Sequence, residues 1–118
     1  MIRDYVDGAW VASLATTSVP VVNPANGEEI GACPMGTEAD VNRAVAAAHA
    51  AFREWRLVPA IERVQYLFKM KALFDANVDE LARSVTREHG KTFIEARASV
   101  KRGIQMVETA TGMPSFQK

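Results

Sequence analysis

The spacing of hydrophobic residues changes once along the chain, after its first 35 residues. In that first segment, short β-prone runs surround the dipeptides Asp7-Gly8 and Asn26-Gly27. Both dipeptides tolerate the positive φ angles that tight hairpin turns require. Residues 1–35 are therefore predicted to form two small β-hairpins. The first turns at Asp7-Gly8, and in the second the runs Val19–Val22 and Ile30–Cys33 flank residues 23–29, with Asn26-Gly27 as the turn.

From Thr37 onward, apolar residues recur every three or four positions, which is the spacing of amphipathic helices. Four α-helices are predicted within residues 37–112. Thr37 with Asp40, and Thr92 with Glu95, place a hydroxyl three residues before a carboxylate, an arrangement that caps a helix N-terminus. The first and fourth helices are expected to begin there.

The second and third helices also have predicted ends. Pro59 marks the beginning of the second helix, because proline is tolerated in a first helical turn. Asn77, with Glu80 three residues later, is predicted to cap the third helix. Gly90 is predicted to end it, since glycine readily adopts the left-handed conformation that follows many helices.

The hexapeptide Arg-Glu-His-Gly-Lys-Thr at residues 87–92 ends like a phosphate-binding loop. That motif needs an earlier glycine at the position that Val85 occupies, and a strand that leads into it. A helical pattern leads into Gly90 instead. The segment is predicted to be the end of one helix followed by the start of the next.

The second helix carries too many apolar residues for a single face. They are Ile61, Val64, Leu67, Phe68, Met70, Leu73 and Phe74. Such a helix must be covered on two sides, and the other predicted elements are too few to do so. Two hairpins and four helices alone would be an α+β arrangement, but this helix favours the edge of a larger α/β domain. The chain also stops without a closing element, so it is expected to be one part of a longer protein.

Composition and charge narrow the range of partners. Basic and acidic residues number 14 each in the 118-residue chain, so the net charge is zero. Nothing draws the chain to nucleic acid or to an anionic membrane, and no apolar run is long enough to span a bilayer. No secretory signal is recognisable, and the single cysteine, Cys33, agrees with a reducing compartment. The sequence predicts a cytoplasmic protein with neither nucleic-acid nor membrane partners.

Few residues are candidates for chemistry. Cys33 ends a β-type run, where no helix N-terminus or neighbouring base would activate its thiol, so it is predicted to be a packing residue. His49 and His89 have no neighbours at the spacing of metal ligands, and both are expected to face solvent. No catalytic residue, cofactor contact or metal ligand is predicted in this chain.

Arg102 and Gly103 are more informative. A glycine inside a helix costs about 1 kcal/mol relative to alanine, so Gly103 indicates the close approach of another backbone or of a ligand. The guanidinium of Arg102 presents a fork of donors that matches a carboxylate. These two residues alone favour a surface arginine beside a close-packed glycine over a binding site.

Several motifs occur in an order that resembles the start of the aldehyde dehydrogenase superfamily. They are Tyr-Val-Asp-Gly-Ala-Trp-Val at 5–11, Asn-Pro-Ala-Asn-Gly-Glu at 23–28, Ala-Phe-Arg-Glu-Trp at 51–55 and Glu-His-Gly-Lys-Thr at 88–92. Within the superfamily, residues 87–92 and Arg-Gly-Ile-Gln-Met-Val-Glu at 102–108 look most like the CoA-acylating methylmalonate-semialdehyde dehydrogenases of valine and inositol breakdown. The resemblance covers the whole chain.

The resemblance implies that residues 1–118 are the N-terminal part of the Rossmann-type α/β NAD-binding domain of a longer, homo-oligomeric enzyme. In that family a cysteine thiolate attacks the aldehyde, hydride passes to NAD, and the acyl group passes to CoA with loss of the carboxyl carbon. Malonate or methylmalonate semialdehyde then gives acetyl-CoA or propionyl-CoA. The catalytic residues and the glycine-rich NAD-binding turn are expected beyond residue 118, so this chain alone is expected to be inactive.

One functional position carries over by resemblance. The arginine of the Arg-Gly-Ile segment in these enzymes helps to bind the carboxylate of the substrate, and it corresponds to Arg102, with Gly103 leaving room. Two alternatives stay open. One is a hydrolytic aldehyde dehydrogenase that acts on a different semialdehyde, and the other is a non-catalytic helical binding module derived from the family.

Overall fold

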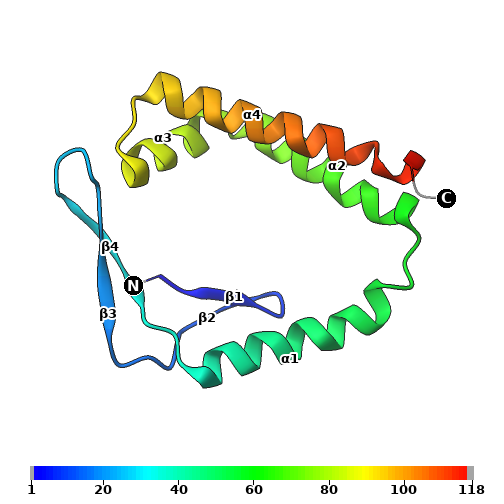
Figure 1. The fold of residues 1–118 in the computed structure, drawn as a ribbon, viewed down its shortest axis with the longest axis horizontal. Helices are drawn as coiled ribbons and strands as arrows, with labels where there is room; N and C mark the ends of the chain where they lie inside the picture. Colours follow the sequence, from blue (N-terminus) through cyan, green and yellow to red (C-terminus); the bar gives the residue numbers. More distant parts are fainter. Residues whose placement is uncertain (1, 117–118) are drawn as a thin grey trace. The chain divides into compact units, whose positions relative to one another are not determined.

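The computed structural model describes residues 2–116, which belong to two units. The first unit contains the residues up to Asn23 together with Gly27–Leu57. The second contains Pro24–Asn26 and the residues from Val58 onward. Figure 1 follows the chain through both units, with the strands near the N-terminus and the helices after them.

The first hairpin pairs β1 (Asp4–Val6) with β2 (Ala9–Val11) in antiparallel register. Its turn residues Asp7 and Gly8 have φ angles of 52° and 76°. Two consecutive positive φ angles are the geometry of a tight hairpin turn whose twist matches that of the strands. The prediction of a hairpin at this dipeptide is confirmed.

The second hairpin pairs β3 (Ser18–Val22) with β4 (Glu29–Pro34), with one irregularity between Val21 and Val22. The two strands flank residues 23–28, close to the predicted 23–29. The Asn23 amide donates to the Glu28 carbonyl at 2.8 Å, and the Gly27 amide donates to the Asn23 carbonyl at 2.8 Å. Gly27 has a φ angle of 75°, so the glycine is needed, but the turn spans residues 23–28.

The first unit ends in the helix α1 (Glu38–Trp55). Thr37 is its N-cap: the Asp40 amide donates to the Thr37 hydroxyl, and the Asp40 carboxylate accepts from the Thr37 amide. The predicted cap is therefore confirmed as a full capping box.

The second unit is helical. It contains α2 (Ala60–Ala76), α3 (Val78–His89), α4 (Phe93–Thr111) and a short 3-10 helix, η1 (Met113–Phe116). Helix α4 packs against both α2 and α3. The buried apolar residues of this unit are small or medium in size: Val64, Ala82, Ala96 and Ile104. The fold of the described residues is thus two two-stranded antiparallel sheets followed by four α-helices, as predicted.

The predicted helix ends at Gly90 and Thr92 are confirmed. At Asn77 the boundary is confirmed, but the predicted side-chain cap is wrong. Gly90 adopts a left-handed φ of 78°, and Thr92 forms a capping box with Glu95. Asn77 is the single residue between α2 and α3, and its side chain makes no N-cap hydrogen bond. Its Nδ2 atom donates instead to the Leu73 carbonyl at 2.7 Å, because a one-residue connection leaves Asn77 at the end of α2.

Helix α2 keeps one apolar side uncovered by the described chain. Val64 is 5% exposed, whereas Ile61 is 65%, Leu73 64% and Phe68 50% exposed. The prediction that this helix has more apolar surface than the chain can cover is confirmed. None of the helices in residues 2–116 is both long and apolar enough to cross a membrane.

Candidate functional site

Arg102 lies on the solvent-facing side of α4. The buried residues of this helix, Ala96 and Ile104, belong to the side that packs within the unit. Arg102 is exposed and forms no hydrogen bond or ion pair with any residue in 2–116. Ion pairs of exposed arginines contribute little to stability. Because the guanidinium of Arg102 has no partner among these residues, its donors are available to bind a carboxylate.

Gly103 is adjacent to Arg102 and leaves its side of the helix open. A Cβ atom built on Gly103 would meet nothing within 4 Å. The predicted close approach is therefore not made by any part of the described chain. Since the helix accepts the cost of a glycine here without gaining a contact, the space above Gly103 is free for a group from outside these residues.

The start of α4 is held by a short chain of polar contacts. Lys91 Nζ donates to Ser99 Oγ at 3.2 Å, and Ser99 Oγ donates to the Glu95 carbonyl at 3.0 Å. The Thr92 hydroxyl and amide both donate to the Glu95 carboxylate, and these bonds lower the pKa of Glu95. The first two turns of α4, which precede Arg102, are thereby fixed in place.

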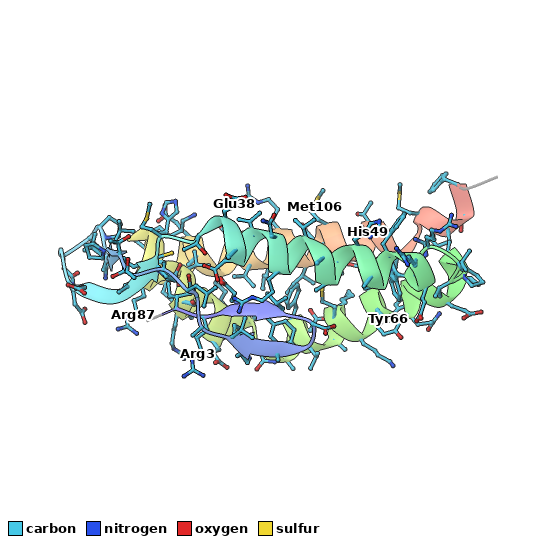
Figure 2. All side chains as sticks on the ribbon, turned by 90° about the horizontal axis from the view of Figure 1, so that it is seen from below. Arg3, Glu38, His49, Tyr66, Arg87 and Met106 are labelled. Carbon is cyan, nitrogen blue, oxygen red and sulfur yellow. The ribbon has the colours of Figure 1, made fainter. Side chains whose placement is uncertain are left out.

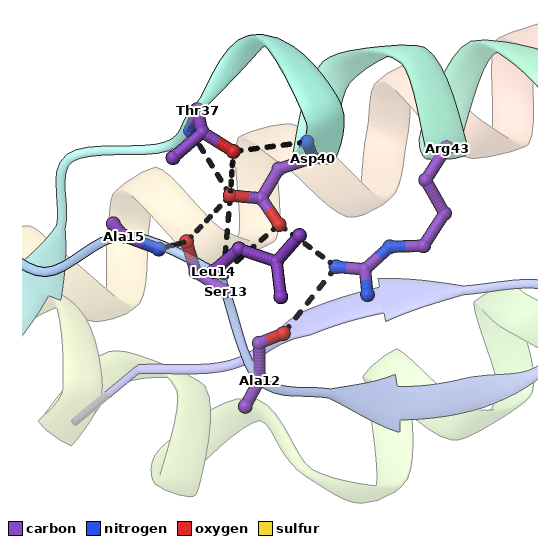
Figure 3. A network of polar contacts seen from close by, with 7 residues as sticks. All are labelled: Ala12, Ser13, Leu14, Ala15, Thr37, Asp40 and Arg43. Carbon is purple, nitrogen blue, oxygen red and sulfur yellow. Dashed lines mark hydrogen bonds and ion pairs between the residues drawn. The ribbon is translucent and has the colours of Figure 1, made fainter.

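The densest polar cluster in the described chain surrounds Asp40 (Figure 3). Its Oδ2 atom accepts from the Ser13 hydroxyl at 2.7 Å, from the Thr37 hydroxyl at 2.9 Å and from the Thr37 amide at 3.0 Å. The Leu14 amide donates to both carboxylate oxygens. Arg43 donates through Nη2 to Oδ1 at 3.0 Å.

These bonds keep the Asp40 carboxylate ionised. The Thr37 amide is the largest influence, followed by the Ser13 hydroxyl and the Leu14 amide, and together they hold the pKa of Asp40 well below its usual range. A carboxylate whose two oxygens accept this many hydrogen bonds is a poor proton acceptor. The role of the cluster is therefore structural: it connects the segment after β2 to the start of α1. The sequence indicated only its local bond to Thr37.

The other residues considered from the sequence do not converge on a site. Cys33 is half-buried in β4, with Sγ 3.7 Å from the Pro34 carbonyl, in agreement with a packing role. His49 and His89 are exposed, as predicted. Within residues 2–116 there is no group of three or more His, Cys, Asp or Glu side chains that could hold a metal ion.

Comparison with known proteins identifies the chain by its sequence. The profile of the aldehyde dehydrogenase family matches residues 10–117, which is nearly the whole chain. The chain belongs to the aldehyde dehydrogenase family. Among curated aldehyde dehydrogenases it is 46% identical over 115 residues to malonate-semialdehyde dehydrogenase 1 of Bacillus licheniformis, and 43% identical to malonate-semialdehyde dehydrogenase 3 of Geobacillus kaustophilus. In both cases 98% of this chain matches 24% of the relative, so the chain spans about a quarter of their length.

Solved aldehyde dehydrogenase structures share the fold. A Sinorhizobium meliloti protein described as a methylmalonate-semialdehyde dehydrogenase, in complex with NAD, superposes with a TM-score of 0.90 at 34% identity. That match covers 96% of this chain and 23% of the other. Aldehyde dehydrogenase C of Pseudomonas syringae, in a mutant form with NAD+ and octanal, gives a TM-score of 0.94 at 35% identity over 99% of this chain and 24% of that one. The two hairpins and four helices thus have the same fold as the matching quarter of these two aldehyde dehydrogenase structures.

Proposed function

We propose that this chain is the N-terminal part of the NAD-binding domain of a CoA-acylating semialdehyde dehydrogenase, and that Arg102 binds the carboxylate of its substrate. The substrate class is malonate semialdehyde and its methyl-branched homologue. The complete enzyme would form a homo-oligomer and release acetyl-CoA or propionyl-CoA.

The exposed, unpartnered guanidinium of Arg102 beside the open position Gly103 is the observation that carries this proposal. A semialdehyde that carries a carboxylate at its other end needs a fixed cation there, so that the aldehyde is presented to the reacting groups in one orientation. A forked guanidinium meets that need better than a point charge. The names of the curated relatives, which are malonate-semialdehyde dehydrogenases, support the same class of substrate.

We place the NAD site of the complete enzyme outside the described residues. Their sheets are two antiparallel hairpins, whereas a dinucleotide is held where a glycine-rich turn joins a parallel strand to a helix N-terminus. NAD would accept the hydride of the aldehyde in the complete enzyme, at a site supplied by chain outside these residues. The contribution proposed for this chain is the positioning of the substrate.

The test uses the complete enzyme, or residues 1–118 joined to the remainder of the Bacillus licheniformis relative. Arg102→Ala should lower kcat/KM for malonate semialdehyde about 100-fold, the loss expected for charge-assisted hydrogen bonds, and leave the KM for NAD unchanged. Turnover of propanal, which has no carboxylate, should hardly change. Lys101→Ala is the matched control, because Lys101 is also an exposed cation of α4 but points about 100° away.

Equal losses for malonate semialdehyde and propanal in Arg102→Ala would refute the carboxylate role. Product analysis separates the CoA-acylating reaction from a hydrolytic one: acetyl-CoA should form only when CoA is present, and release of a free dicarboxylic acid would favour the hydrolytic alternative. A third outcome, a 118-residue chain that unfolds cooperatively and binds no dye for exposed apolar surface, would favour the binding module.

A further inference from the structure

We infer that Met106 is a specificity-determining residue that contacts the substituent on the substrate carbon between the carboxylate and the aldehyde. The inference rests on the proposed function, since it places Met106 beside the carboxylate that Arg102 would bind. It assigns to this chain the discrimination between unbranched and alkyl-branched semialdehydes.

The position of Met106 follows from helix geometry. It comes four residues after Arg102 and three after Gly103 on α4, so it is a side-chain neighbour of both. Helical side chains lean toward the N-terminus and cover the turn before their own Cα atom. The Met106 side chain therefore leans over the turn that carries the guanidinium and the bare glycine backbone.

Met106 is also largely exposed. It is 67% exposed, and its side chain stands off the α4 ribbon in Figure 2. It does not belong to the side of α4 where Ala96 and Ile104 are buried. An apolar side chain of this size next to an unpaired cation and an open glycine forms a surface with a charged end and an apolar end.

The other neighbours of Arg102 do not offer this combination. Ala98, four residues earlier, is too short to reach across a turn. Ser99 is committed to hydrogen bonds with Lys91 and Glu95. Gln105 is polar and lies on the flank of Arg102 that faces away from Gly103, by the rotation of about 100° per residue. Met106 is thus the one neighbour of Arg102 on α4 that is both long and apolar.

The chemistry of the substrate matches this surface. In a 3-oxo acid the branching carbon is bonded directly to the carboxylate carbon, so a methyl branch must lie within a few bond lengths of the guanidinium. The flexible, polarisable thioether of methionine adapts to small apolar groups. Gly103 leaves room for the short backbone of the substrate, while Met106 covers its branch.

The experiment compares three substrates in the complete enzyme: malonate semialdehyde, methylmalonate semialdehyde and propanal. Met106→Ala should lower the ratio of kcat/KM for the methyl-branched over the unbranched semialdehyde about tenfold, as for loss of one apolar contact in a binding pocket. Met106→Gln, which keeps the length but adds polarity, should lower the same ratio without opening a cavity. Met106→Leu should keep it.

Met113→Ala is the matched control, since Met113 is also an exposed methionine, 53% exposed, but lies in η1 away from Arg102. A ratio that changes less than about twofold in Met106→Ala and Met106→Gln, as in Met113→Ala, would overturn the inference. Failure of the proposed function looks different: the parent enzyme would then show no preference for either semialdehyde over propanal.

Discussion

Replacing Gly90 with alanine should destabilise this chain more than replacing Gly27, although the two glycines share nearly the same φ angle. Gly90 has a φ of 78° and Gly27 a φ of 75°. Alanine pays about 1–2 kcal/mol to adopt the left-handed region, so this strain is common to both substitutions. The difference between them comes from their surroundings.

A Cβ atom at Gly27 would meet nothing within 4 Å. At Gly90 it would lie 2.9 Å from Pro24 Cγ and 3.0 Å from the backbone nitrogen of Ala25. The loop that carries Pro24 and Ala25 would have to move away, and forcing an extra carbon into a packed site costs about 1–3 kcal/mol more. We expect a total of about 2–5 kcal/mol for Gly90→Ala and about 1–2 kcal/mol for Gly27→Ala.

The assay is urea unfolding of the 118-residue chain and its two variants, followed by circular dichroism in the helical band. Hydrogen exchange gives a local measure, because the amide at position 90 donates to the Thr86 carbonyl at 2.9 Å and reports opening of the corner between α3 and α4. Equal losses of stability in the two variants, within about 0.5 kcal/mol, would show that the contact with Pro24 and Ala25 contributes nothing.

Three further predictions concern the described residues. The pKa of Asp40 is lowered in the folded chain, so its hydrogen bonds stabilise the fold above about pH 4 and are lost as the pH falls further. Protection of the Leu14 amide from hydrogen exchange should therefore decline on acidification. Asp40→Asn should abolish most of that pH dependence. Val64→Ala should lower the free energy of unfolding of this chain in urea by about 2 kcal/mol, because Val64 is buried. Ile61→Ala, at an exposed position, should change that free energy by less than about 0.5 kcal/mol and should instead reduce the binding of a dye for apolar surface. Thr92→Ala should cost about 1 kcal/mol in thermal or urea unfolding and Asn77→Ala less than half as much, since only Thr92 caps a helix with its side chain; equal costs would contradict the assignment.

Helix and turn boundaries were predictable because their causes are local. Thr37 and Asp40, Thr92 and Glu95, and the dipeptide Asp7-Gly8 each act within one turn of chain, so the residue types alone indicate the geometry. The prediction failed in part where two local roles compete. Asn77 ends α2 and precedes α3 at once, and its residue type cannot say which helix receives its side chain.

The candidate site was predictable only as a pair of residues. The sequence singled out Arg102 and Gly103, and the structure adds that both are exposed and that no described residue approaches Gly103. Met106 was not predicted as a site residue, because a single methionine has no sequence pattern that distinguishes a packing residue from a binding residue. Its exposure became known only when the packed side of α4 was known.

The sequence by itself determined the order of two hairpins and four helices, the chemistry at their ends, and the resemblance to aldehyde dehydrogenases. The tertiary structure decided that Asp40 binds Ser13 and Leu14, that Gly90 leaves no room beside Pro24, and that α2 buries Val64 while Ile61 stays exposed. The reason is distance along the chain. Caps and turns depend on neighbours a few residues away, whereas burial and long-range hydrogen bonds depend on which remote segment arrives at a given face, and apolar spacing alone does not specify that segment.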